Sequence, residues 1–276
     1  MPRSRCWQAS PEVTMNIVVT VKQVVDPNLP ADFIRVDPAT QRIVSTYGLP
    51  PAMNGYDANA LEAALKLRET HGGKVTAICL GDGASRNTLK RAHAMGADAV
   101  VLLSDPTWAD LDSAGAALVL AAAIRRIGDV SLVLCGRQAS DTDAGQVLFW
   151  IAEALGLPAV CPVARIEESG EDSLVVHRLL DDGYQRVRVR LPALLGVSSE
   201  INDPRSPSMK GTMIASRSLA PTWTASDLSV PQLLPKLRMK KQEIQLRTSS
   251  ARLIEAETAA AKGAALADRL HEAGLI

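Results

Sequence analysis

Aromatic side chains are scarce in this sequence: Trp, Tyr and Phe together make up 3% of its 276 residues. A core built mainly from aromatic rings is therefore excluded. Hydrophobic residues of all kinds still reach 47% and charged residues 22%, a balance typical of a globular chain with a sizeable core. That core must be aliphatic, and the length favours one large domain with a smaller appendage.

The sequence also has no excess of charge of either sign, since 30 Lys and Arg balance 30 Asp and Glu. Without net charge there is no global field to attract nucleic acid or an anionic membrane, and we expect neither as a partner. No apolar stretch approaches the length of a transmembrane helix, so direct membrane insertion is not expected.

Cysteines and histidines are few and scattered. The four cysteines form no CxxC pair, and Cys79 and Cys135 lie inside aliphatic runs, as is typical of buried, reduced thiols in a cytoplasmic protein. The four histidines show no spacing typical of metal ligands. We therefore expect a cytoplasmic protein without a metal site.

The first 14 residues, MPRSRCWQASPEVT, contain two Arg but lack the apolar run of a secretory signal. Met15 follows them and is succeeded at once by the aliphatic run NIVVTVK. Residues 1–14 are interpreted either as a disordered extension or as the product of a start codon placed too far upstream. In both cases the fold is expected to begin at Met15.

From Met15 onward, short aliphatic runs alternate with amphipathic segments. Strands are predicted at 16–22, 74–80, 98–105, 131–136, 159–168 and 192–200, helices at 55–73, 85–97, 109–129 and 144–156, and hairpins at 33–45 and 173–192. Aliphatic strands separated by helices imply a mostly parallel sheet covered on both faces. The predicted fold class is α/β, a three-layer, doubly wound α/β/α domain of the nucleotide-binding type.

In such sheets, ligands bind beyond the carboxyl ends of the strands, near the point where strand order reverses. Four segments follow strand ends here, at 20–23, 80–83, 103–105 and 136–146. Glycines in two of them let the backbone approach a ligand, and a helix expected to begin near Asp143 would direct free N–H groups there. With Lys22 and Arg137 adding positive charge, the pattern is consistent with a phosphate site.

The same residues also fit purely structural roles. Asp143 followed by Gln146 has the form of a capping box, and the glycines of 80–83 permit a tight turn. Lys22 and Arg137 belong to residue types that are usually solvated. Because no complete GxGxxG or GxxxxGK[ST] pattern occurs, the residues alone leave both interpretations open.

Longer stretches of the chain resemble one known family. They are VKQVVD (21–26), NGYDANALEAAL (54–65), LGDG (80–83), AMGADAVVLLSD (94–105), CGRQASDTDAGQV (135–147), LPALLGVSSEINDPRSPSMKG (191–211) and the terminal HEAGLI. In this order they resemble the electron transfer flavoprotein beta subunit, or FixA, family from about Met15 to the C-terminus.

The resemblance implies an adenine nucleotide site at the strand ends described above, which holds AMP or, in electron-bifurcating members, a second FAD. The expected cofactor-binding residues, with Lys22 added for its charge, are Thr20, Lys22, Asn54, Gly55, Tyr56, Asp57, Leu80, Gly81, Gly136, Arg137, Gln138, Ala139, Asp141, Asp143, Gln146 and Val147. Within this set Asp143 is expected to cap a helix, and Gln146 and the loop amides to contact the ligand.

No catalytic residue is expected, because electron transfer requires positioned flavins rather than bond breaking by the protein. Asp112 and Glu153 are interpreted as caps or solvated helix faces.

The resemblance further implies a heterodimer with an alpha subunit, which carries the redox-active FAD. Such pairs pass electrons from flavin dehydrogenases, such as acyl-CoA dehydrogenases, to a membrane quinone oxidoreductase or another acceptor. We therefore expect an electron carrier subunit, with an electron-bifurcating subunit as the alternative. A stand-alone nucleotide-binding protein of the universal stress type shares the fold class, but it has no use for the NDPR segment or the long C-terminal part.

Three regions are expected along the chain: the extension at 1–14, a nucleotide-binding domain at 15–215, and an arm with a helix at 216–276 that contacts the alpha subunit. The domain ends in the family's recognition loop, 202–215. There Met209, Lys210 and Met213 are expected to contact a partner, although Met at this spacing is also typical of ordinary packing. The alternative for the arm is a helix that packs on its own.

Two stretches depart from the family pattern. SRSLAPTWTASDL (216–228) has Arg217 as its only basic residue where many members have a lysine-rich run, so an unusual electron donor or acceptor is expected. QVLF stands at 146–149 where members with FAD in the beta subunit commonly have QVGP. Leu148 in place of Gly is expected to close space beside the ligand loop, which argues against a second FAD, whereas GRQASDTD and NGYD resemble the members that hold one.

Overall fold

The structure is a computed structural model that describes residues 14–46, 48–170, 172–244, 251 and 253–276. The chain divides into two compact units, Met1–Gln242 and Glu243–Ile276, which are described separately. The expectation for residues 1–14 concerns mainly residues 1–13, which lie outside the described residues. The expected boundary at residue 216 between the domain and the arm stays a prediction.

The larger unit is built on a sheet of nine strands among the described residues. They are β1 (Met15–Thr20), β6 (Gly73–Leu80), β7 (Ala99–Leu103), β8 (Leu132–Gly136), β9 (Ala159–Ser169), β10 (Ser173–Leu180), β11 (Gly183–Arg190), β12 (Ala193–Val197) and β13 (Thr222–Trp223). Their order is β11-β10-β9-β12-β8-β1-β6-β7-β13, with only the β9–β10–β11 pairings antiparallel. The predicted mostly parallel α/β/α fold is confirmed.

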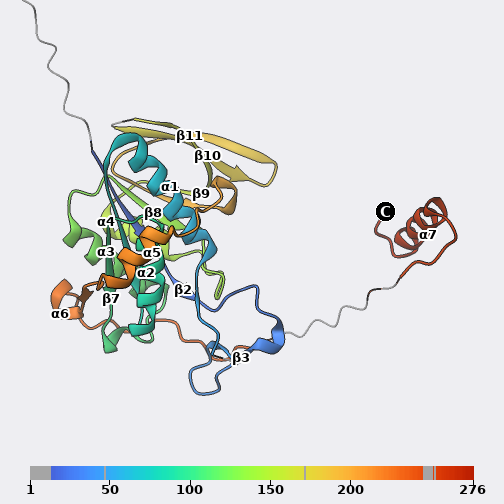
Figure 1. The fold of residues 1–276 in the computed structure, drawn as a ribbon, viewed down its shortest axis with the longest axis horizontal. Coiled ribbons are helices and arrows are strands. Elements are labelled where there is room, and N and C mark those ends of the chain that lie inside the picture. The colour runs from blue at the N-terminus through green and yellow to red at the C-terminus, as the bar shows by residue number, and fades with distance from the viewer. Residues whose placement is uncertain (1–13, 47, 171, 245–250, 252) are drawn as a thin grey trace, which may run out of the picture. The chain divides into compact units, whose positions relative to one another are not determined.

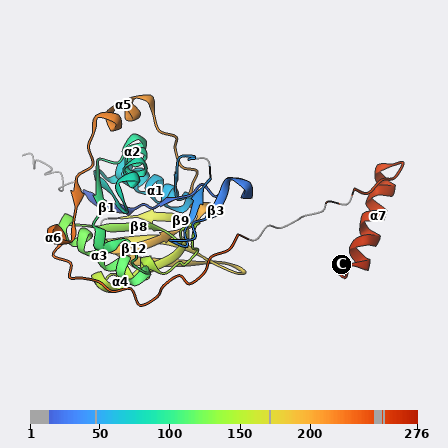
Figure 2. The same cartoon turned by 90° about the horizontal axis from the view of Figure 1, so that it is seen from below.

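Helices cover both faces of this sheet, as Figure 2 shows. One face carries α1 (Gly55–His71), α2 (Arg86–Met95) and α5 (Met209–Arg217); the other carries α3 (Ser113–Ile127) and α4 (Val147–Leu155), with the short α6 (Ala225–Leu228) alongside. Two aliphatic cores lie between the layers, one on each face. Alternate β1 residues feed them, since Ile17 and Val19 pack in one core and Val18 in the other.

Short elements complete this unit. They are β2 (Gln23–Val24), β3 (Ile34–Val36), β4 (Ile43–Ser45), β5 (Ala52–Met53) and the 3₁₀ turns Ala31–Phe33, Gly83–Ser85, Pro106–Trp108 and Ser199–Ile201. β3 and β4 pair antiparallel and form the hairpin predicted at 33–45, near the lower edge of Figure 1. The second predicted hairpin is β10–β11, which extends the main sheet.

The strand order reverses between β1 and β8. After β1 the chain adds β6 and β7 on one side, then returns to place β8 on the other side of β1, parallel to it. The carboxyl ends of β1 and β8 therefore lie side by side where open α/β sheets bind ligands. The fold thus places the segments after Thr20 and Gly136 next to each other.

Two residues, Asn202 and Arg205, fix the segment before α5 onto α1. The Arg205 guanidinium contacts the buried Glu62 carboxylate through Nε at 2.7 Å and reaches Glu69 at 2.6 Å. Asn59 Nδ2 donates to the carbonyl oxygen of Asn202 at 2.7 Å, and the Asn202 side chain donates back at 3.1 Å. The NDPR segment therefore connects α1 to α5.

Caps and thiols also match the sequence interpretation. Asp112 is the N-cap of α3, where Oδ1 accepts from Gly115 N at 2.9 Å, and its Oδ2 accepts from Lys236 N at 2.8 Å. Burial raises the pKa of the Cys79 and Cys135 thiols to about 12, so both remain protonated and unreactive at neutral pH.

The smaller unit contains α7 (Ala259–Glu272), none of whose residues is buried. No helix of the described residues is both long enough and apolar enough to cross a bilayer.

Candidate functional site

The structure brings together three of the segments predicted to form a site. They are the end of β1 with Lys22, the first turn of α1 with Asn54 to Asp57, and the loop 136–146 between β8 and α4. All three meet at the point where the strand order reverses. We call this arrangement the switch-point site.

Asp57 lies at the centre of the switch-point site and is buried. Its Oδ2 accepts a hydrogen bond from Lys22 N at 2.8 Å, and its Oδ1 accepts one from Gly136 N at 3.2 Å. One carboxylate thus joins the ends of β1 and β8 through their backbones. Burial raises the pKa of Asp57 to about 7, although the bonds from Lys22, Asn54 and Gly136 oppose that shift.

Asn54 holds the loop that follows β8. Its side chain is buried, with Nδ2 donating to the Gln138 carbonyl oxygen at 2.8 Å and Oδ1 accepting from Ser140 N at 3.2 Å. Asn54 precedes α1 but makes no side-chain capping bond to it. Asn54 and Asp57 were both expected to bind the cofactor, yet their polar atoms are engaged with backbone that shapes the loop.

Side chains of the loop contact one another and Lys22. Lys22 Nζ lies 2.7 Å from Asp141 Oδ2, and Gln138 Nε2 donates to Asp143 Oδ1 at 2.9 Å. Arg137 Nε donates to Gln138 Oε1 at 3.2 Å, and the Arg137 guanidinium carbon lies 5.6 Å from the centre of the Tyr56 ring. Two cations, Lys22 and Arg137, therefore lie at the loop together with two carboxylates, those of Asp141 and Asp143.

Close packing of α1 against β8 depends on Gly136. A Cβ there would lie 2.4 Å from Asp57 Oδ1 and 2.7 Å from Tyr56 Cβ. No side chain fits in that space, so glycine permits the approach. Gly55, the first residue of α1, is exposed, and Ala139 in the loop is half-buried.

The expected capping role of Asp143 is wrong. α4 begins at Val147 with Gln146 at its N-cap position, and no side chain caps it. Asp143 has a φ of 46° and Gly145 a φ of 60°, so the backbone before Gln146 is not helical. Gln146 is exposed, and Val147 packs partly against the core.

Leu80 and Gly81 end the strand on the other side of β1. Gly81 N donates to the Leu103 carbonyl oxygen at 3.0 Å, towards β7 and away from β8. A Cβ on Gly81 would lie 2.2 Å from Ser85 Oγ, so a larger residue would require the Ser85 side chain to move. The predicted segment 103–105 is also structural, since Asp105 Oδ2 accepts from Ala225 N at 3.0 Å. The turn interpretation thus explains Gly81, while its ligand contact stays a prediction.

One feature of the loop was not found from the sequence. Ser140 Oγ is buried without a hydrogen-bond partner among the described residues, although it lies between the loop residues predicted to bind. No sequence pattern marks this position.

Leu148, which directly follows Val147, is 3% exposed and packs in the core beneath α4. Its expected effect on the space beside the ligand loop stays a prediction.

The residues predicted to bind a partner lie on α5. Met209 is 88% exposed and Met213 59%, so ordinary packing does not explain them; Lys210 is also exposed. Gly211 brings α5 against α2, because a Cβ there would lie 2.2 Å from the Ala94 carbonyl oxygen. Partner binding by these residues stays a prediction.

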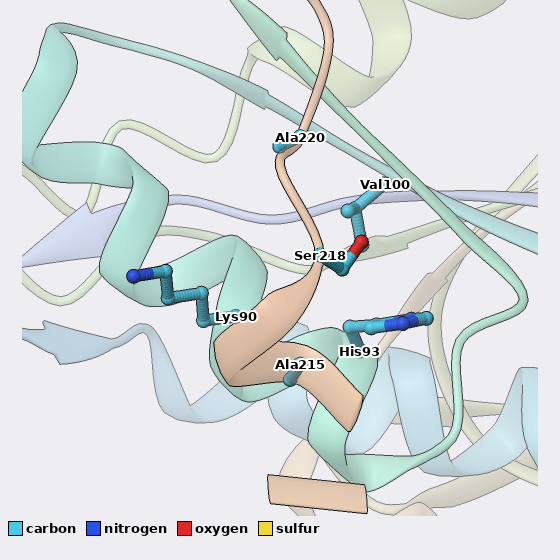
Figure 3. A pocket seen from close by; sticks show the side chains of 6 residues that line it. All are labelled: Lys90, His93, Val100, Ala215, Ser218 and Ala220. Carbon is cyan, nitrogen blue, oxygen red and sulfur yellow. The ribbon is translucent and has the colours of Figure 1, made fainter. Parts of the chain in front are cut away.

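A shallow hollow lies between α2 and α5, seen from close by in Figure 3. Its lining includes His93, Val100 and Ala215, and it encloses about 160 Å³, part of which is open solvent. That volume is below the range typical of ligand pockets. Among the described residues, no three His, Cys, Asp or Glu side chains are grouped so as to hold a metal ion.

Comparison with known proteins finds relatives that match most of the chain. Residues 42–228 match the family described as the electron transfer flavoprotein domain. The chain is 40% identical over 245 residues to electron transfer flavoprotein subunit beta of Thermoanaerobacterium thermosaccharolyticum, with 88% of each chain covered. It is 38% identical to the caffeyl-CoA reductase-Etf complex subunit CarD of Acetobacterium woodii (78% and 80% covered) and 37% identical to protein FixA of Azorhizobium caulinodans (79% and 78% covered).

These matches extend well beyond the switch-point site. The chain belongs to the electron transfer flavoprotein beta subunit, or FixA, family, and the resemblance found in the sequence is confirmed. Membership gives it a role in electron transfer.

Proposed function

We propose that this chain is the beta subunit of a heterodimeric electron transfer flavoprotein and binds an adenine nucleotide at the switch-point site. The observation that carries the nucleotide proposal is the loop after β8, whose backbone is held by Asn54 and by Asp57 from the first turn of α1. A loop fixed in this way presents pre-organised donors to a phosphate. Lys22 and Arg137 supply positive charge beside it.

Within this proposal the residues divide into two groups. Asn54, Asp57 and Gly136 act as positioning residues, because their contacts are to backbone and to one another. The remaining predicted residues are proposed to form the cofactor-binding surface: Thr20, Lys22, Gly55, Tyr56, Leu80, Gly81, Arg137, Gln138, Ala139, Asp141, Asp143, Gln146 and Val147. A bound flavin would supply the redox chemistry, while this chain binds and orients it.

AMP and a second FAD both remain compatible with the site. Leu148 in place of Gly argues against a second FAD, whereas the GRQASDTD and NGYD segments favour the electron-bifurcating subunit as a second candidate. AMP would make the chain a simple carrier partner of an FAD-bearing alpha subunit.

The proposed partners follow from the same assignment. The relatives include proteins named as a beta subunit and as a subunit of a caffeyl-CoA reductase-Etf complex. An alpha subunit is therefore proposed as the first partner, with flavin dehydrogenases and a quinone oxidoreductase as electron donor and acceptor. Met209, Lys210 and Met213 on the exposed face of α5 are proposed to dock a redox partner.

Counting the flavins tests the nucleotide proposal. The complex of this chain with its alpha subunit is expected to release one adenine compound from the switch-point site when denatured, beside the FAD of the alpha subunit. Chromatography of the supernatant would identify it: one FAD with AMP indicates simple carriage, and two FAD indicate bifurcation. A complex that releases no adenine compound beyond one FAD would contradict the site.

The smaller unit leads to a second prediction. Since none of the residues of α7 is buried, its apolar side chains are expected to need a partner. We expect the chain expressed alone to aggregate or to melt broadly, and co-expression with the alpha subunit to yield a stable dimer. Size-exclusion chromatography and thermal melting would check this. A sharply melting monomer of the isolated chain would count against the proposed heterodimer.

A further inference from the structure

Lys22 and Asp141 form an ion pair at the edge of the switch-point site. The ammonium nitrogen lies 2.7 Å from Asp141 Oδ2 and 2.8 Å from Oδ1, and the two side chains are 43% and 28% exposed. The residues are separated by 119 positions in the chain, so the pair connects the end of β1 to the loop after β8. It links two of the three segments that form the site.

The Asp141 carboxylate contacts the Lys22 ammonium group, which the phosphate of the proposed nucleotide would also contact. Asp143, two residues further on, differs because its carboxylate accepts from the uncharged Gln138 amide. The hydroxyl of Ser140, adjacent to Asp141, is buried without a partner among the described residues. Of the two loop carboxylates, Asp141 is therefore the one paired with a cation.

We propose that Asp141 competes with the ligand's phosphate for Lys22 and so weakens the binding of phosphorylated adenosine compounds at the switch-point site, while leaving the binding of unphosphorylated ones unchanged. This inference rests on the proposed nucleotide site. An uncharged ligand has no anionic group that could replace the Asp141 carboxylate beside the Lys22 ammonium group. A phosphate dianion carries more charge than the carboxylate, and Coulomb attraction grows with charge at equal distance.

The experiment is a double-mutant cycle in the complete complex with the alpha subunit, after the endogenous nucleotide has been removed from the site. Calorimetric titrations with AMP and with adenosine compare Asp141→Asn, Lys22→Met and the double variant with the unmodified complex. Glu153→Gln is the control, because it neutralises an exposed carboxylate of α4 that lies outside the residues proposed to bind the nucleotide.

Asp141→Asn is expected to bind AMP about fivefold more tightly, which corresponds to the upper range of a partly exposed ion pair. Its affinity for adenosine should stay unchanged. In the Lys22→Met background, the same substitution should give no gain, and Glu153→Gln should change AMP affinity less than twofold. If Asn disturbs the loop, Asp141→Ser removes the same charge and should show the same gain.

Weaker or unchanged AMP binding by Asp141→Asn and Asp141→Ser would overturn the competition while leaving the nucleotide site intact. A gain that persists without Lys22 would overturn it too, since the effect would then be general charge repulsion. An unmodified complex that binds neither AMP nor FAD at this site would overturn the proposed nucleotide site, and this inference with it.

Discussion

Replacement of Gly136 by alanine is expected to remove the adenine nucleotide from the complex and to destabilise this chain by about 3 kcal/mol. The added Cβ would lie 2.4 Å from Asp57 Oδ1 and 2.9 Å from the Tyr56 carbonyl carbon. Because the Tyr56 contact is to backbone, rotation of a side chain cannot relieve it, and α1 must move away from β8. Overpacking of this kind costs roughly 1–3 kcal/mol, and loss of the bond from Gly136 N to the Asp57 carboxylate adds to it.

Nucleotide content per complex and thermal melting measure the two effects of Gly136→Ala. The melting temperature should fall by roughly 8 °C, given the size of the domain. Gly83→Ala is the matched control: Gly83 also follows a strand of the main sheet, but no atom lies within 4 Å of its added Cβ. If Gly136→Ala keeps a full complement of nucleotide, the site does not require the close approach of α1 to β8.

The fold was predictable from the sequence where strands are buried on both sides. β1, β6 and β8 consist of aliphatic runs, such as NIVVT, because a strand covered by helices on both faces can carry apolar residues at every position. β13 was not predicted. Thr222–Trp223 has no aliphatic run, and it joins the sheet through tertiary contacts, with Ser104 N donating to the Trp223 carbonyl oxygen at 3.0 Å.

The position of the site was predictable for a related reason. Parallel strands bring their carboxyl ends to one edge, so the segments after Thr20 and Gly136 had to meet if β1 and β8 were neighbours. The individual roles could not be read from residue types. Asn54 and Asp57 have the chemistry of ligand contacts, and only the structure shows that they bond to backbone.

The failure of the Asp143 prediction has a similar cause. A capping box is recognised by two residues three positions apart, but it requires helical backbone after the first of them. Here Gly145 adopts a φ of 60°, which interrupts the helix before it can begin. The sequence contained the glycine, but a glycine alone does not reveal the sign of its φ.

The stability of the complex is expected to depend on pH through Asp57, and replacement by Asn should remove that dependence. Asp57 lies buried between the amides of Lys22 and Gly136, and burial raises its pKa from 3.8 to about 7. Between these values the unfolded chain has lost this proton while the folded chain keeps it. The unfolded state then binds fewer protons, so the contribution of Asp57 to stability is present below pH 4 and is lost as the pH rises towards 7.

Each pKa unit corresponds to about 1.4 kcal/mol, so the difference between the two pKa values amounts to about 4 kcal/mol. Urea unfolding of the complex at pH 4.5 and pH 8, for the unmodified chain and for Asp57→Asn, gives the four free energies required. The stability advantage of the unmodified chain over the variant should shrink by roughly 3 kcal/mol across that interval, because most of the titration falls within it. The side-chain oxygen of the introduced Asn can still accept the shorter hydrogen bond, from Lys22 N, but its NH₂ group faces Gly136 N and cannot accept a bond from it. Because Asn does not titrate, the resulting loss of stability is expected to be the same at every pH. Asp143→Asn serves as the control, since that carboxylate is exposed. An advantage that is the same at both pH values would mean that Asp57 is ionised throughout, and that the amides of Lys22 and Gly136 outweigh its burial.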